Sequence, residues 1–64
     1  MDKPHVHFFD DMDAARDWYY DQGWAMLAMV RTADRHEIEM GKGDTRMLLT
    51  KYDDWYSVGA FIQR

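Results

Sequence analysis

The absence of cysteine most constrains how a chain of only 64 residues can fold. A domain of this size buries only about 60% of the surface that its unfolded chain exposes, so we expect marginal stability. Small domains often compensate with disulfides or thiolate-bound metals, and this chain can form neither. Association is a third way to bury apolar surface. We therefore expect a single domain over residues 1–64, in the reducing cytoplasm, with surface available for association.

The sequence also favours a soluble, folded protein. Met1–His5 lacks the basic and apolar regions of a secretion signal. The longest apolar run, Trp24–Val30, has seven residues, whereas a membrane-spanning helix needs about 20. Apolar residues make up 47% of the chain, which is too many for the composition of a disordered protein. The chain has six methionines and 16% aromatic residues, so we expect several of these side chains at the surface as contact residues.

A strand and an amphipathic helix are predicted before Gly23. His5–Phe9 is short, aromatic and β-branched, as strands are. Asp10 or Asp11 can cap a helix that Gly23 ends. Residues at three- and four-residue spacing form its apolar side, namely Met12, Ala15, Trp18, Tyr19 and Gln22.

Strands are predicted after Gly23. Trp24–Val30 has no polar residue, which indicates a central strand covered on both faces. Arg35–Met40 alternates, with Ile38 and Met40 on one face and Glu37 and Glu39 on the other. Further strands are predicted at Thr45–Tyr52 and Trp55–Ile62, with turns at Thr32–Asp34, Gly41–Asp44 and Asp53–Asp54. A helical turn within Thr50–Ser57 is the alternative for the last segment.

The order β-α-β-β-β(-β) predicts an α+β fold with one amphipathic helix packed on a mainly antiparallel sheet. A helix between the first two strands would make them parallel, through a right-handed crossover, either as neighbours or on the two sides of another strand. One helix cannot cover both faces of a sheet. The uncovered face is therefore expected to meet solvent, a second copy of the chain or a partner.

Three groups of residues resemble catalytic or ligand sites, but each has a simpler explanation. Gly41–Thr45 lacks the spacing of a phosphate loop and is typical of a hairpin turn. His5 and His7 could begin a metal site, but only His36 and remote carboxylates could complete it. Ser57 is the only serine, and the aspartates would need a pocket that desolvates them. We therefore expect no enzymatic activity, cofactor or metal.

Direct binding of single-stranded nucleic acid is an alternative that the charge disfavours. Aromatic residues that could stack bases are Trp24, Tyr52, Trp55, Tyr56 and Phe61. Basic residues in the same half of the chain are Arg31, Arg35, Lys42, Arg46 and Lys51. However, residues 24–64 carry six acids and six bases, without the basic excess that phosphate binding usually requires.

The formal charge of −4 lies in residues 1–23, which carry six acids and two bases. Asp10, Asp11 and Asp13 suit the positive end of a helix. Asp17 and Asp21 do not, because they extend a row of like charges at four-residue spacing, and Arg16 relieves only part of the repulsion.

The acidic helix face predicts a protein that binds a basic surface, such as that of a nucleic-acid-binding enzyme. Carboxylates one turn apart repeat about every 6 Å, close to the spacing of backbone phosphates. The composition and charge layout are similar to those of phage-encoded inhibitors that occupy nucleic-acid sites on host enzymes. The expected contact residues are Asp13, Asp17, Asp21, Tyr20, Trp55 and Tyr56. A self-associating structural subunit, for example a homodimer, is a further alternative.

Overall fold

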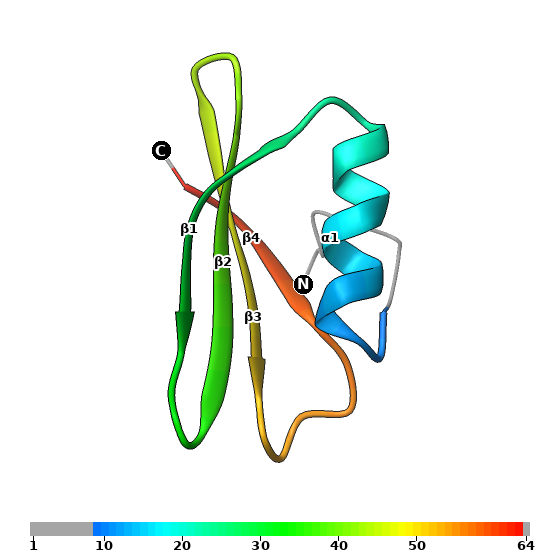
Figure 1. Cartoon of the computed structure of the whole chain (residues 1–64), viewed down its shortest axis with the longest axis vertical. Coiled ribbons are helices and arrows are strands. Elements are labelled where there is room, and N and C mark those ends of the chain that lie inside the picture. The colour runs from blue at the N-terminus through cyan, green and yellow to red at the C-terminus, as the bar shows by residue number, and fades with distance from the viewer. Residues whose placement is uncertain (1–8, 64) are drawn as a thin grey trace.

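The computed structural model describes residues 9–63, which form one helix packed on a four-stranded antiparallel sheet (Figure 1). The strand order in the sheet, β1-β2-β3-β4, follows the chain. The predicted α+β fold class is confirmed. The elements are α1 (Met12–Asp21), β1 (Ala25–Arg31), β2 (Arg35–Lys42), β3 (Thr45–Tyr52) and β4 (Gly59–Gln63). In the described range the one helix, α1, has ten residues and is far too short to cross a bilayer.

Both ends of α1 follow from local sequence signals. Asp11 is the N-cap, and its carboxylate accepts a hydrogen bond of 3.3 Å from the backbone N–H of Ala14. After the helix, Gly23 has φ +97°, a conformation that side chains disfavour. The N–H of Trp24 then donates to the carbonyl of Tyr19 at 3.0 Å, which is the long bond of a Schellman motif. The predicted capping aspartate and terminating glycine are confirmed.

The core lies between α1 and one face of the sheet. In β2, Ile38 and Met40 are buried on this face, and Glu37 and Glu39 lie on the opposite face, as the alternation predicts. Directly opposite Ile38 and Met40 in β3 are Leu49 and Met47. The buried apolar residues are Met12, Ala15, Tyr19, Ile38, Met40, Met47, Leu49 and Val58.

The prediction that Trp24–Val30 is a buried central strand is wrong. The corresponding strand, β1, lies at the end of the sheet, and all seven of its residues are exposed. The meander places β1 beside β2 alone, and α1 leaves its side chains open to solvent. An uninterrupted apolar run is therefore not evidence of a central position in this sheet.

The last segment also differs from its prediction. β4 begins at Gly59, and Trp55–Val58 lies in the loop that joins β3 to β4. A helical turn within Thr50–Ser57 is wrong as well, because β3 continues to Tyr52 and a turn follows at Asp53 and Asp54. The expected reversal at these two aspartates is confirmed.

The predicted first strand, His5–Phe9, lies outside the described residues except for Phe9. Phe9 is not part of a strand, but its carbonyl accepts a 2.7 Å hydrogen bond from the N–H of Val58. The ring of Phe9 lies 6.1 Å from that of Trp18. The hydrogen bond places Phe9 beside the residue that precedes β4.

The sheet face opposite α1 has no covering layer among the described residues, as expected for a domain with one helix. Strand alternation places Glu37, Leu48 and Phe61 on this open face, with Tyr52 at one end. Trp55 lies against Tyr52, with 5.1 Å between the ring centroids. The open face thus combines carboxylates with a cluster of aromatic rings.

Candidate functional site

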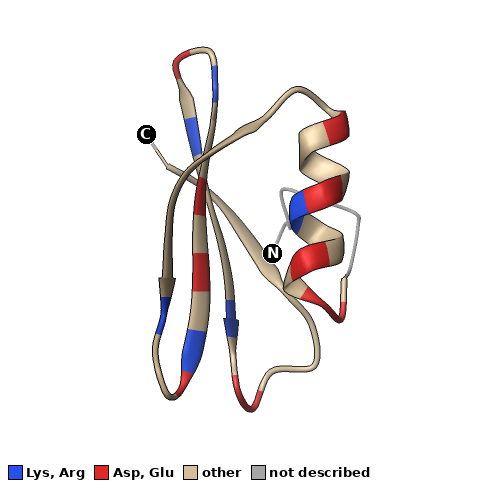
Figure 2. Cartoon of the chain, in the orientation of Figure 1, with Lys and Arg blue, Asp and Glu red and all other residues tan. Residues whose placement is uncertain are grey.

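The predicted acidic row lies along the exposed side of α1 (Figure 2). The side chains of Asp13 and Asp17 are 64% and 67% exposed. Met12, Ala15 and Tyr19 on the other side of the helix are buried in the core, which fixes the orientation of the row. The four-residue spacing therefore produces the outward-facing acidic surface that the sequence predicts.

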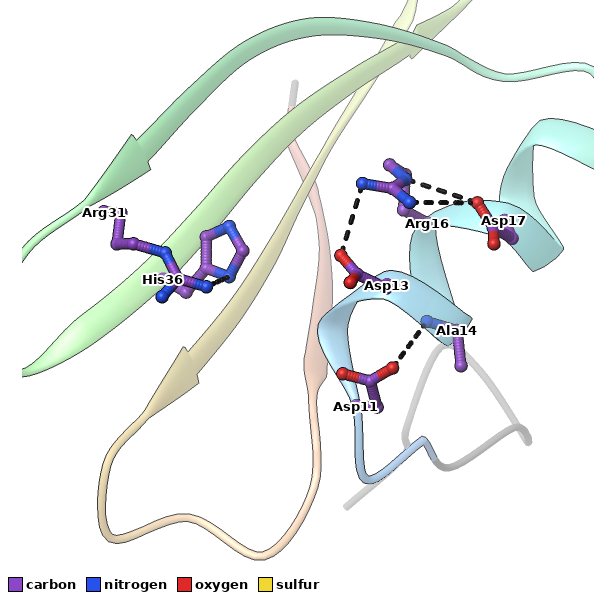
Figure 3. A network of polar contacts seen from close by, with 7 residues as sticks. All are labelled: Asp11, Asp13, Ala14, Arg16, Asp17, Arg31 and His36. Carbon is purple, nitrogen blue, oxygen red and sulfur yellow. Dashed lines mark hydrogen bonds and ion pairs between the residues drawn. The ribbon is translucent and has the colours of Figure 1, made fainter.

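Arg16 contacts two of these carboxylates at once (Figure 3). Its Nη1 lies 3.2 Å from Oδ1 of Asp13, and its Nη2 lies 3.2 Å from Oδ1 of Asp17. Because both carboxylates are exposed, each pair contributes little to stability. A net charge of −1 remains on this group of three side chains.

Asp21 completes the row in a less favourable place. It is the last residue of α1, where the helix dipole is negative and where the last turn has no basic residue. Lys42 donates from Nζ to the carbonyl of Gln22 at 2.7 Å and so neutralises part of this helix end. Asp21 is exposed and forms no ion pair with any of residues 9–63.

The three predicted aromatic contact residues do not all lie with the acidic row. Tyr20 is 44% exposed and belongs to α1, next to Asp21. Trp55 lies against Tyr52 on the sheet face away from α1. Tyr56 is 94% exposed in the loop between β3 and β4. The structure therefore joins Tyr20 to the acidic row and separates Trp55 from it.

A basic row across the sheet was missed by sequence reasoning. Arg31, His36 and Lys51 are direct neighbours on β1, β2 and β3, on the face that α1 covers. Nη2 of Arg31 lies 3.5 Å from Nδ1 of His36 (Figure 3). No local spacing could reveal the row, because the strand register alone brings the three residues together.

The basic row lines a cleft of about 240 Å³ beside the start of α1. Burial disfavours the charged imidazolium, and Arg31 adds repulsion, so the pKa of His36 is lowered from 6.5. Its Nε2 is buried without a hydrogen-bond partner in the described part of the chain. Asp10 and Asp11 from the helix start and Asp53 from the turn after β3 line the same cleft, so it combines both signs of charge.

The described residues hold no candidate metal cluster, because no group of three or more histidines and carboxylates among residues 9–63 could hold a metal ion. His5 and His7 lie outside the described residues. Gly43 has φ +60° in a two-residue turn between Lys42 and Thr45, so the glycine-rich segment forms the hairpin that its spacing predicts.

Comparison of the chain with protein-family models, with curated proteins and with solved structures gives no significant match.

Proposed function

We propose that this chain is a non-catalytic protein that binds a basic surface of another protein through the outer face of α1 and so inhibits or regulates that partner. The observation that carries the proposal is the exposed acidic row of Asp13, Asp17 and Asp21, flanked by the half-exposed ring of Tyr20. A row of one sign beside a rigid aromatic residue is the combination that favours fast encounter and specific anchoring.

The charge distribution supports a basic protein as the partner. Residues 10–21 carry five aspartates and one arginine, a net charge of −4 on one short segment. The carboxylates repeat about every 6 Å along the helix, so they could occupy positions that phosphates take in a groove built for nucleic acid. An inhibitor or regulator that acts as a nucleic-acid mimic, of the kind that phages encode, would use this surface.

The open sheet face is a rival surface with a different ligand. Trp55 and Tyr52 form an aromatic pair there, and the guanidinium carbon of Arg35 lies 6.0 Å from the centroid of the Tyr52 ring. Such rings can stack bases. However, Glu37 and Glu39 on the same face balance the charges of Arg35 and Arg46. Glu37 also forms an ion pair of 3.2 Å with Arg35, so the face lacks the basic excess that phosphate binding usually requires. The geometry therefore favours the acidic helix face over direct nucleic-acid binding.

The test compares two variants of equal charge. Asp17→Asn with Asp21→Asn removes two charges from the acidic row, and Asp53→Asn with Asp54→Asn removes two from the exposed turn after β3. Affinity capture from a lysate of the native host identifies the bound protein, and binding to that purified protein is then measured from 50 to about 300 mM salt. We expect at least tenfold weaker binding and a flatter salt dependence for the helix pair alone.

Equal losses for the two pairs would show that net charge, rather than the helix face, determines binding. Duplex DNA as a competitor tests mimicry, since it should displace the chain from a shared groove. A titration of the purified chain with single-stranded DNA and RNA, followed by tryptophan fluorescence, tests the rival surface. Tight binding in that titration would replace the proposal with nucleic-acid recognition by the open sheet face.

A further inference from the structure

Among residues 9–63, nothing pairs with the outer edge of β1. β1 pairs with β2, and no other strand of the described chain lies beside it, so one row of its backbone N–H and C=O groups lacks a ladder partner. Natural edge strands usually carry charged residues or proline against further pairing. Residues 25–30 contain neither. The exposed apolar side chains on this strand are Met26, Leu27, Met29 and Val30.

A β-bulge in the middle of β1 determines how its side chains divide between the two faces. The register passes from Met26 opposite Met40 to Ala28 opposite Glu39, which leaves Leu27 as the extra residue. The side chain of Leu27 lies over Gly41, since a Cβ added to this glycine would lie only 2.9 Å from Cδ1 of Leu27. A side chain at position 41 would point to the open face. Leu27 and Ala28 therefore both lie on the open face.

The bulge makes this pattern symmetric about the Leu27–Ala28 peptide. Met26 and Met29 lie on the face toward α1, one on each side of that point. Ala25 and Val30 lie on the open face, also one on each side. Followed from either end, β1 therefore directs its successive side chains to the two faces of the sheet in the same order.

We propose that β1 pairs antiparallel with β1 of a second copy of the chain to form one eight-stranded sheet, with the two-fold axis between the two strands at the level of their Leu27–Ala28 peptides. In this register Met26 lies opposite Met29 of the second copy, on the face that carries both helices. Ala25 lies opposite Val30 of the second copy on the open face. The bulge interrupts the ladder at the axis, so the two flanks of the strand make the pairing.

Charge complementarity supports a second copy as the occupant of this edge. Arg31 is the single charged residue of β1. The proposed register places it opposite Trp24 of the second copy, three residues after the exposed Asp21 that ends that copy's α1. Lys42 already donates to the carbonyl of Gln22 at this helix end, so the complementarity rests on the carboxylate of Asp21. The two arginines lie seven positions apart, or about 23 Å, beyond the range of strong repulsion at physiological salt.

The expected dimer is weak. A standard interface takes about 800 Å² from each partner. That is roughly a sixth of the 4558 Å² surface of this chain. The seven residues of β1 supply only part of such an area. We therefore expect a dissociation constant of about 1–100 μM, with monomer at nanomolar concentration.

Sedimentation velocity from about 1 to 500 μM tests the proposal on the whole chain. We expect concentration-dependent dimer for the wild type. Met29→Lys, which places a charge on the pairing edge, should raise the dissociation constant at least tenfold. Tyr56→Lys, at a 94% exposed position in the β3–β4 loop, is the matched control and should leave the dimer unchanged. Thermal unfolding of each variant checks that it is folded.

Cross-linking tests the register separately. The chain has no native cysteine, so Met26→Cys and Met29→Cys each introduce a single thiol. Mixing the two variants and oxidising them should give far more disulfide-linked dimer than oxidising either alone, because these positions face each other across the axis. Equal yields would overturn the register.

A wild type that stays monomeric to 500 μM would overturn the dimer and would make a strand of another protein the candidate for this edge. A dimer that Met29→Lys leaves intact would place the contact on another surface, such as the open sheet face. The test is independent of the proposed function, since neither variant touches the acidic row of α1.

Discussion

β1 and β3 are similar in composition but opposite in burial. Both contain methionine and leucine among their central residues, yet all seven residues of β1 are exposed, whereas Met47, Leu49 and Thr50 of β3 are buried. Both strands contact α1, but β3 has a strand on each side, while β1 stands at the end of the sheet. The difference shows that the place of a strand in the sheet, rather than its apolar content, decides what it contributes to stability.

The same substitution in the two strands should give very different results. Leu49 is 0% exposed and Leu27 is 50% exposed. Leu49→Ala should lower the free energy of unfolding by about 2–5 kcal/mol, because it leaves a cavity in the core. Leu27→Ala should lower it by less than about 1 kcal/mol. Urea denaturation measures both losses, at a low protein concentration at which the proposed dimer is dissociated. Similar losses would contradict the assignment of β1 to an exposed edge.

A second substitution tests the buried polar side chain of β3, which lies opposite Glu37 on the sheet face away from α1. The hydroxyl of Thr50 is buried and has no hydrogen-bond partner among the described residues. Thr50→Val keeps the shape and removes this unsatisfied group, so it should raise the free energy of unfolding by about 1 kcal/mol. Thr45→Val, at the exposed start of β3, should change it by less than about 0.5 kcal/mol. A destabilised Thr50→Val variant would mean that a water bonds the hydroxyl.

The smallest effect is expected at His36, which lies between Arg31 of β1 and Lys51 of β3. Burial and Arg31 lower its pKa from 6.5, and the opposing attraction of Asp11 and Asp13 does not outweigh them. The unfolded chain therefore binds this proton more readily, so stability falls as pH drops through 6.5.

Thermal unfolding from pH 8 to pH 5 should show a smaller loss of stability for His36→Gln than for the wild type. The variant removes the titrating group and leaves Arg31 and Lys51 in place. An equal loss in both proteins would show that other groups, such as the histidines outside the described residues, produce the pH dependence.

Much of the helix and part of the sheet could be predicted from local signals. Asp11 and Gly23 end α1 through hydrogen bonds within a few residues, and the alternation in Arg35–Met40 assigns its two faces directly. The position of β1 in the sheet could not be predicted, because an apolar run looks the same in a central strand as in an exposed edge strand. Trp55–Val58 was predicted as strand for its aromatic and β-branched residues, although it forms a loop.

The candidate site has some features that follow from sequence spacing and others that depend on tertiary packing. Four-residue spacing on a helix places Asp13, Asp17 and Asp21 on one side whatever the rest of the fold does. The contacts of Arg16 with Asp13 and Asp17 are also local, since all three residues lie within five positions of α1. That Trp55 lies on the other side of the sheet required the packed structure. The sequence predicted Trp55 as a contact residue from its aromatic character, which carries no information about the face on which it lies.

The sequence by itself determined the ends of α1, the orientation of its acidic side and the hairpin at Gly43, because all three depend on hydrogen bonds or periodicity within a few residues. Only the tertiary structure decided that β1 is an exposed edge and that Arg31, His36 and Lys51 form a row. Those features arise from strand order and register, which are set by packing between segments distant in the chain.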